Sequence, residues 1–175
     1  HLSTNFQGDR IILQFNERIK LERVRDRMLV SPPLDAPPHV RISGAKNVVI
    51  ELKAPLKQNT TYTFAIGEAV RDLTEGNPAA GLTYVLSTGD AVDSLEVTGV
   101  VADAFKGTRE RDVLVLLYAQ DDTSTFRSGR PTYATRTDSS GTFHLQHLRG
   151  GSYTINALRD QNANSCSLAS SEFAR

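Results

Sequence analysis

The sequence predicts an all-β protein made of two consecutive Greek-key β-sandwiches, and three observations lead to this prediction. Short apolar runs alternate with turn residues, and about seven such strands fall within the first 90 residues, a spacing typical of sandwiches rather than of βαβ units. A leucine, a polar turn over 57–61 and a tyrosine that opens a strand form the pattern of a tyrosine corner. A new series of strands begins after the polar segment 90–94, which reads as a linker.

The tyrosine corner occupies residues 56–66. Tyr62, Phe64 and Ile66 fall on one face of the predicted strand, because successive side chains in a strand point to opposite sides. We expect the Tyr62 hydroxyl to bond to the backbone just after Leu56, and both residues are therefore assigned a structural role.

The first strand is predicted from the alternation of Ile11, Leu13 and Phe15. Residues 22–27 could form a helical turn, and their arginines are interleaved with acidic residues, which favours a solvated face over a phosphate site. Prolines between residues 31 and 38 mark strand edges and crossovers, because proline has no amide to donate to a sheet.

A hairpin is predicted in the middle of this half. Residues 40–42 and 48–52 are apolar runs, and the turn 43–47 between them is rich in Gly and Asn. Residues 67–78 read as a long connection with a Gly-Asn-Pro breaker, and the strand 82–86 closes the unit.

The second half shows five further strand patterns. Residues 113–119 are continuously apolar, as in a strand buried on both faces. The other runs are 95–102, 132–136, 143–148 and 153–158.

A tight turn precedes the fourth of these runs. The Asp138 side chain can accept a hydrogen bond from the backbone two residues on, and Gly141 can take a positive φ. Both residues are assigned a structural role.

Two family resemblances rest on these residues. The first 90 residues resemble the bacterial Ig-like domains of the S-layer SbsA type, and the rest resembles a carboxypeptidase-regulatory, prealbumin-like β-sandwich. The residues behind the first resemblance are Ile11, Leu13, Phe15, Ser31 to Pro33, Leu56, Asn59 to Tyr62, Asp72, Gly76 to Pro78 and Ser87 to Gly89. Those behind the second are Gly99 to Val101, Val113, Val115, Leu117, Thr137 to Phe143, Gly151, Tyr153 and Ala157.

The resemblance implies two Ig-like/prealbumin-like domains in tandem, as in envelope proteins of Bacteroidetes-type bacteria. The expected boundaries are 1–90 for the first domain and 95–164 for the second. Residues 165–175 are Ser/Ala-rich and without periodicity, so this tail is doubtful as native sequence. The first residues read like the middle of a longer protein.

Composition argues against several functions. Lys+Arg and Asp+Glu number 20 each, so the basic excess of a nucleic-acid-binding protein is missing. No apolar run approaches the length of a membrane span, and the single cysteine, Cys166, excludes an internal disulfide framework. No Gly-x-Ser-x-Gly elbow or phosphate-binding loop occurs, so we expect no catalytic or cofactor-binding residues and no enzyme activity.

Two aromatic or histidine groupings invite functional readings. His144 and His147 would lie on opposite faces of one strand, which disfavours a shared metal ion. Tyr84, Tyr118 and Tyr133 could form a sugar-stacking platform, but without any tryptophan, packing in the core is preferred.

One calcium site is a candidate. Asp160, Asn162 and Asn164 place oxygen side chains at alternate positions, like the opening of a Ca²⁺ loop. The later glycine and bidentate acid of such a loop are missing, so a plain turn is the preferred interpretation.

The resulting hypothesis is a non-catalytic cell-envelope module, acting as a structural spacer or as an interaction domain for a protein or a surface polymer. The alternative is an accessory region of a larger secreted or surface enzyme. A third reading, a carrier of a small ligand, would need an oligomeric channel, whereas we expect a monomer. The location would be periplasmic or extracellular, with a lipid anchor in the full-length protein as one form.

Overall fold

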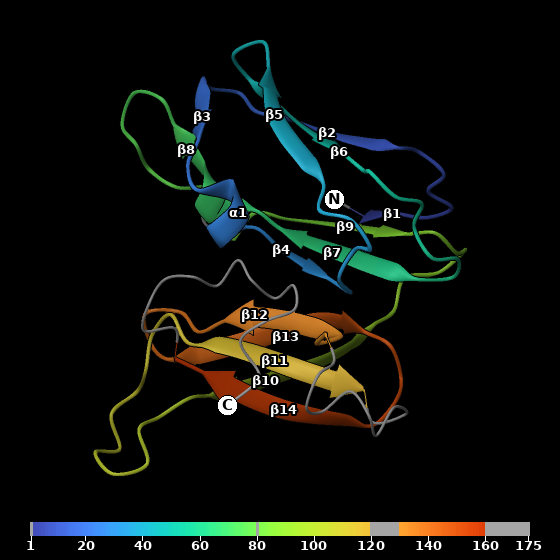
Figure 1. The fold of residues 1–175 in the computed structure, drawn as a ribbon. Coiled ribbons are helices and arrows are strands. Elements are labelled where there is room, and N and C mark those ends of the chain that lie inside the picture. Colours follow the sequence, from blue (N-terminus) through green and yellow to red (C-terminus); the bar gives the residue numbers. More distant parts are fainter. Residues whose placement is uncertain (1, 80, 120–129, 160–175) are drawn as a thin grey trace. The chain divides into compact units, whose positions relative to one another are not determined.

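The structure is a computed structural model that describes residues 2–79, 81–119 and 130–159. Its chain divides into two compact units, and each is described by itself (Figure 1). Unit 1 comprises residues 1–30 and 34–92, and unit 2 comprises residues 31–33 and 93–175. Almost every regular element is a strand, so the predicted all-β class with consecutive β-sandwiches is confirmed.

Unit 1 contains two main sheets. The larger has the strand order β1-β9-β7-β4 and the second the order β2-β6-β5, while β3 and β8 form a separate pair. A short helix, α1 (Val24–Arg27), and a 3-10 turn, η1 (Gly67–Ala69), interrupt the strands. The strands are β1 Leu2–Ser3, β2 Arg10–Gln14, β3 Ile19–Leu21, β4 Leu29–Ser31, β5 His39–Ser43, β6 Asn47–Glu51, β7 Thr61–Ala65, β8 Val70–Asp72 and β9 Thr83–Ser87.

The core of unit 1 draws on the inner faces of both sheets. Alternation places every second side chain inward, so Ile11 and Leu13 of β2 are buried while Ile12 between them is 58% exposed. Tyr62, Phe64 and Ile66 belong to one buried cluster, as the alternation after the tyrosine corner predicts. The cluster also contains Leu13, Ile19, Val48, Ile50, Val70 and Leu86.

The predicted hairpin is confirmed, but one predicted connection contains an additional strand. β5 and β6 pair in antiparallel fashion around a turn, with Ile42 opposite Val48. Within 67–78, β8 pairs with β3, so that Ile19 lies opposite Asp72. Three residues are too few to show a period, which is why the pattern indicated only a connection.

Unit 2 is a smaller sandwich. One sheet has two strands, β10-β13, and the other has three, in the order β12-β11-β14. Its core joins Val115 and Leu117 of β11 to Phe143 and Leu145 of β13. The strands are β10 Leu95–Val100, β11 Leu114–Ala119, β12 Tyr133–Arg136, β13 Thr142–Leu148 and β14 Tyr153–Leu158.

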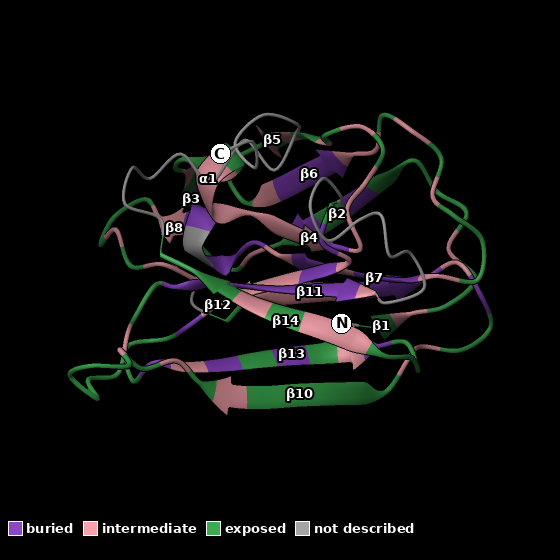
Figure 2. Ribbon diagram, turned by 60° about the horizontal axis from the view of Figure 1, so that its bottom comes forward, coloured by how far each residue is buried: buried purple, intermediate pink, exposed green. Residues whose placement is uncertain are grey.

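The burial of β10 and β11 differs sharply (Figure 2). Leu114 to Tyr118 are all buried, so the continuous apolar run at 113–119 is confirmed as a strand buried on both faces. β10 is largely exposed, and its Gly99 lies opposite Phe143. A Cβ on Gly99 would lie 2.7 Å from the Phe143 ring. The ring therefore packs over Gly99 in the space that a side chain would otherwise fill.

Candidate functional site

The Tyr62 side chain anchors the turn that precedes its own strand. Tyr62 is buried, and its hydroxyl accepts a hydrogen bond from the backbone N–H of Lys57 at 3.1 Å. Burial raises the pKa of the Tyr62 phenol above its ordinary value, which keeps it protonated. Leu56, next to the turn, packs against the core of unit 1. Tyr62 thus closes the turn from the interior, and the partly buried Leu56 packs beside it.

Thr88 fastens the same turn from the other side. Its hydroxyl donates to the carbonyl oxygen of Lys57 at 2.7 Å and accepts from the N–H of Thr60 at 3.0 Å. The following Gly89 lies against Asn59, and a Cβ at that glycine would be 3.3 Å from the Asn59 Cα. No role for Thr88 was predicted from the sequence; the signal was a Ser-Thr-Gly triplet directly after an apolar strand.

The Asp138 carboxylate stabilises a turn in unit 2. Its Oδ1 accepts hydrogen bonds from Ser140 N at 2.8 Å, Ser140 Oγ at 2.7 Å and Thr142 N at 3.0 Å. These bonds, with the Ser140 hydroxyl foremost, lower the pKa of Asp138. Gly141 has φ +76°, and a Cβ there would lie 3.0 Å from Glu110 N. Both residues therefore serve the turn.

Two other aspartates build turns in the same way. Asp103 Oδ1 accepts from the N–H groups of Phe105 and Lys106, both at 2.9 Å. Asp72 Oδ1 accepts from the N–H groups two and three residues on. Backbone amide donors lower the pKa of both carboxyls. In all three turns the aspartate accepts hydrogen bonds from backbone N–H groups a few residues further along the chain. This local role accounts for the three carboxylates without a ligand.

Two tyrosines hold one residue of unit 2. The N–H of Arg149 donates to the Tyr133 hydroxyl at 3.1 Å, and the Tyr153 hydroxyl donates to the Arg149 carbonyl at 2.7 Å. The two rings meet edge to face at 5.8 Å. Burial and the neighbouring Tyr133 raise the pKa of Tyr153 to about 12.

The tyrosines considered for sugar stacking do not form an exposed platform. Tyr118 and Tyr133 are buried, and Tyr84 is half-buried against the core of unit 1. Packing, the preferred interpretation from the sequence, agrees with these positions.

The histidines pair with separate partners. His144 Nε2 lies 3.1 Å from Glu96 Oε2, and His147 Nδ1 lies 3.1 Å from the Asp93 carbonyl oxygen. A bulge separates them, because the β10–β13 register shifts between Leu95 and Val97 and His147 takes φ +60°. In the part of the chain that the structure describes, no three His, Cys, Asp or Glu side chains gather around a possible metal position.

Comparison with known families identifies the first unit. The family model described as "Bacterial Ig-like domain" matches residues 1–88. The chain belongs to the bacterial Ig-like domain family. This match covers the tyrosine corner and ends at Thr88, so the contacts of Lys57 lie inside the Ig-like domain.

Comparison with individual proteins adds little. No curated protein matches the chain. Among solved structures, the crystal structure of BcpA, the major pilin subunit of Bacillus cereus, is 10% identical, with a TM-score of 0.30. That alignment covers 85% of this chain and 47% of the pilin chain, so the chain spans about half of that protein.

Charged side chains gather on the outer face of the Ig-like domain. Glu51 lies 3.2 Å from His39 Nδ1, 3.0 Å from Arg41 Nε and 3.6 Å from Lys53 Nζ. The hydrogen bonds from His39 and Arg41 lower the pKa of Glu51 to about 2. Glu51 is therefore the shared partner of Arg41 and Lys53 at this exposed cluster.

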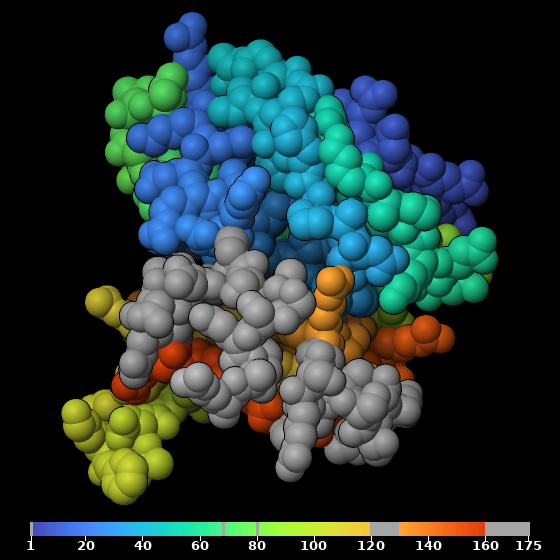
Figure 3. Space-filling model, viewed as in Figure 1, coloured from blue at the N-terminus to red at the C-terminus, as the bar shows by residue number. Residues whose placement is uncertain are grey.

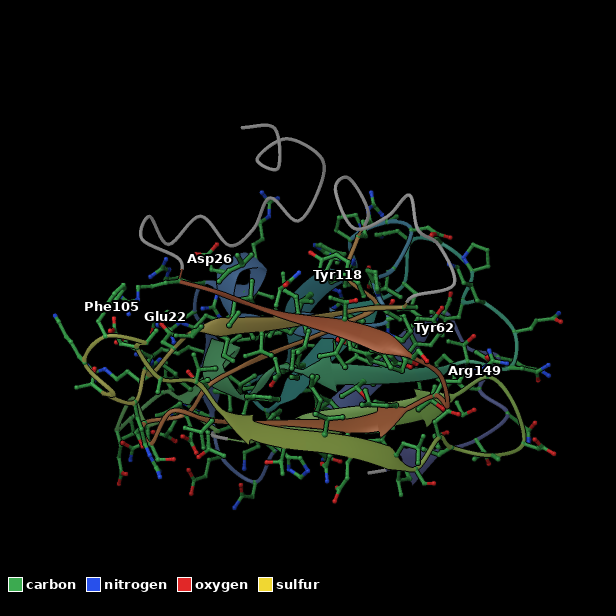
Figure 4. The ribbon with its side chains drawn as sticks, turned by 90° about the horizontal axis from the view of Figure 1, so that it is seen from below. Glu22, Asp26, Tyr62, Phe105, Tyr118 and Arg149 are labelled. Atoms are coloured by element: carbon green, nitrogen blue, oxygen red, sulfur yellow. The ribbon has the colours of Figure 1, made fainter. Side chains whose placement is uncertain are left out.

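The largest exposed apolar side chains lie mainly outside the Ig-like domain, in unit 2. Phe105 is fully exposed at the tip of the loop that Asp103 organises (Figure 4). The same loop stands out as a separate knob, yellow-green in Figure 3. Further exposed apolar residues follow two edge strands: Leu95, Val97 and Val100 on β10, and Ile155 and Leu158 on β14.

The calcium candidate cannot be placed. Asp160, Asn162 and Asn164 lie outside the described residues, as does Cys166, so calcium binding stays a prediction. The neighbouring Asp72 carboxylate raises the pKa of Glu17. Among the described residues no helix is long and apolar enough to cross a membrane.

Proposed function

We propose that the chain is a non-catalytic structural module of a bacterial surface protein, in which two β-sandwiches in series act as a spacer. The proposal rests on the hydrogen-bond partners of the polar side chains. Tyr62, Thr88, Asp138, Tyr133 and Tyr153 all bond to backbone groups of their own unit. Residues that would be free to act on a substrate are instead committed to closing turns.

Finer assignments belong to the same proposal. Unit 1 would be of the SbsA type and unit 2 a carboxypeptidase-regulatory, prealbumin-like domain, as the sequence resemblances imply. We place the protein in the cell envelope, periplasmic or extracellular, with or without a lipid anchor. An accessory role beside a catalytic domain elsewhere in a longer protein is compatible with the same module.

The spacer role predicts that the chain neither self-associates nor binds to the cell envelope. Purified full chain is examined by sedimentation velocity and by co-sedimentation with isolated bacterial cell envelopes. A spacer is expected to sediment as a monomer and to stay in the supernatant when the envelopes are pelleted. An unrelated soluble β-sandwich protein serves as the negative control. Saturable binding to the envelopes, or a stable dimer, contradicts the spacer role.

A second candidate function, an interaction domain, is favoured by β10. Among the residues that the structure describes, this strand pairs only with β13, so its other edge has no partner strand within that part of the chain. Val101 N donates a hydrogen bond to Gly141 O, so Val101 directs its backbone groups toward β13. Because this direction alternates along an antiparallel strand, Gly99 and Val97 also face β13. Thr98 and Val100 therefore direct their backbone groups to the open edge, where an extended segment of another protein could add a strand.

Lysine substitutions separate the two candidates. Val100→Lys places a charge on the open edge of β10, which disfavours strand addition. Ile12→Lys makes the same change at a comparably exposed site in unit 1. Loss of a dimer or of envelope binding in Val100→Lys alone supports the interaction domain. Equal behaviour of both variants contradicts strand addition at β10.

A further inference from the structure

The first and last strands of unit 1 are neighbours that run in the same direction. β1 lies at the edge of its sheet and pairs in parallel with β9. Leu2 lies opposite Val85, and Ser3 lies opposite Leu86. The chain thus enters unit 1 along one strand of this pair and leaves it along the other (Figure 1).

Two further backbone hydrogen bonds extend the contact beyond β1. The N–H of Asn5 donates to the Gly89 carbonyl at 2.8 Å, and the N–H of Phe6 donates to the Ser87 carbonyl at 3.0 Å. The Phe6 side chain packs against the core of unit 1. The entering segment is therefore bonded to the leaving segment along β1 and again at Asn5 and Phe6.

The parallel direction decides how tension would act on these bonds. A pull at the start of β1 and a pull at the end of β9 point in opposite directions along adjacent strands. The hydrogen bonds between the two strands lie across the direction of the pull. They therefore share the load and must break together. In an antiparallel pair pulled at its two adjacent ends, the bonds open one after another, and each bears the load alone.

The exit end of β9 is held from its other side, so it cannot peel away first. β9 pairs with β7 from Thr83 to Ser87. Just beyond, Thr88 N donates to Thr60 O at 3.1 Å, and the Thr88 hydroxyl donates to Lys57 O at 2.7 Å. A pull on residue 90 is therefore passed into the sheet and onto the β1–β9 pair.

We infer that unit 1 resists tension applied along the chain, with the β1–β9 pair as its shear contact. This assigns a mechanical function to a segment whose side chains suggest none. It deepens the proposed spacer role, and depends on that role only for its biological use.

Force spectroscopy with two pulling geometries tests the inference. The full chain carries Cys166→Ser and a handle at Asp90→Cys. The second handle is an added cysteine before residue 1, or Gln58→Cys at the exposed turn before β7. The first geometry shears β1 against β9. The second peels β7 from β9 in antiparallel fashion, because Thr61 pairs with Ser87 beside both handles. We expect the rupture force in the first geometry to exceed that in the second clearly, because the shear geometry loads the β1–β9 bonds together.

Deleting residues 1–3 supplies the matched variant. It removes β1, so the force in the first geometry falls to the level of the second, while the force in the second geometry is unchanged. Equal forces in the two geometries of the intact chain overturn the inference, even where the deletion variant does not fold. An unchanged force after the deletion overturns it as well. Envelope binding or dimer formation would remove the spacer role and leave this result intact.

Discussion

Tyr62 and Thr88 hold the same residue from two sides, because the hydroxyl of Tyr62 accepts from Lys57 N–H and the hydroxyl of Thr88 donates to Lys57 C=O. Lys57 itself is exposed, and only its backbone takes part. The two hydroxyls come from β7 and from the end of β9, so this single residue ties both strands to the turn before β7. Arg149 is held by Tyr133 and Tyr153 in the same manner in unit 2.

The variant Tyr62→Phe tests the first of these bonds. It leaves the ring in place and the Lys57 N–H without its partner, so we expect a loss of about 1–3 kcal/mol in the free energy of unfolding with no change of fold. Urea denaturation followed by circular dichroism measures the loss. Tyr84→Phe, on neighbouring β9, is the control and should stay within about 0.5 kcal/mol. A Tyr62→Phe chain as stable as the wild type would contradict the anchoring role.

The variant Thr88→Val tests the second bond. Valine keeps the shape but removes the hydroxyl that serves Lys57 O and Thr60 N, so we expect a loss of about 1–3 kcal/mol in the free energy of unfolding. Thr88→Ser retains the hydroxyl and should keep most of the wild-type free energy of unfolding. Because both variants act on Lys57, the double variant with Tyr62→Phe should be non-additive. Strict additivity would mean that the two bonds do not act on one turn.

Gly141→Ala and Gly44→Ala form a matched pair. Both glycines have positive φ, which costs about 1–2 kcal/mol for a residue with a Cβ. At Gly44 no atom lies within 4 Å of the position that a Cβ would take, whereas at Gly141 Val101 O lies at 3.1 Å from it. We therefore expect the urea midpoint to fall further for Gly141→Ala. Equal shifts would show that backbone strain alone matters at both turns.

The Asp138 turn should make stability depend on pH. The pKa of Asp138 is lowered in the folded chain, so its contribution is present above the ordinary value of about 3.9 and is lost as pH falls through the lowered value. Asp138→Asn should have a lower urea midpoint than the wild type at pH 7, and the gap should narrow at acid pH. Asp9→Asn, at an exposed aspartate, is the control and should show no gap. A gap that stays constant with pH would exclude the carboxylate as its cause.

The boundary predicted at 89–95 can be tested by limited proteolysis. Residues 90, 91 and 94 are exposed, and a protease should cut in this segment or in the tail 165–175 before it cuts within either sandwich. Mass spectrometry of the first fragments identifies the cuts. Early cuts inside β6 or β11, with 89–95 intact, would contradict two independently folding domains.

Local patterns predicted much of the fold. Strict alternation placed Ile11, Leu13 and Tyr62 in the core, and the continuous apolar run placed β11 in the interior. The Asp138 turn was predictable because its bonds reach only two to four residues along the chain. Each of these features follows from a short stretch read by itself.

Features that depend on distant partners were not predictable. The β3–β8 pair joins three-residue strands about fifty positions apart, and neither shows a period. The bulge at His147 changes which side chains face inward, so Leu148 is buried where plain alternation from Leu145 would expose it. The Ser-Thr-Gly triplet did not reveal the role of Thr88, because its partners, Lys57 and Thr60, lie in another turn.

The pairing of β1 with β9 also has a consequence for biosynthesis. The first strand of unit 1 finds its partner only in the last, so the sheet cannot be completed until residue 89 has left the ribosome. At typical synthesis rates this takes on the order of ten seconds, far longer than a hairpin such as β5–β6 needs to form. Until then the β9-facing edge of β1 stays unpaired, and the arrival of Ser87-Thr-Gly89 completes the domain.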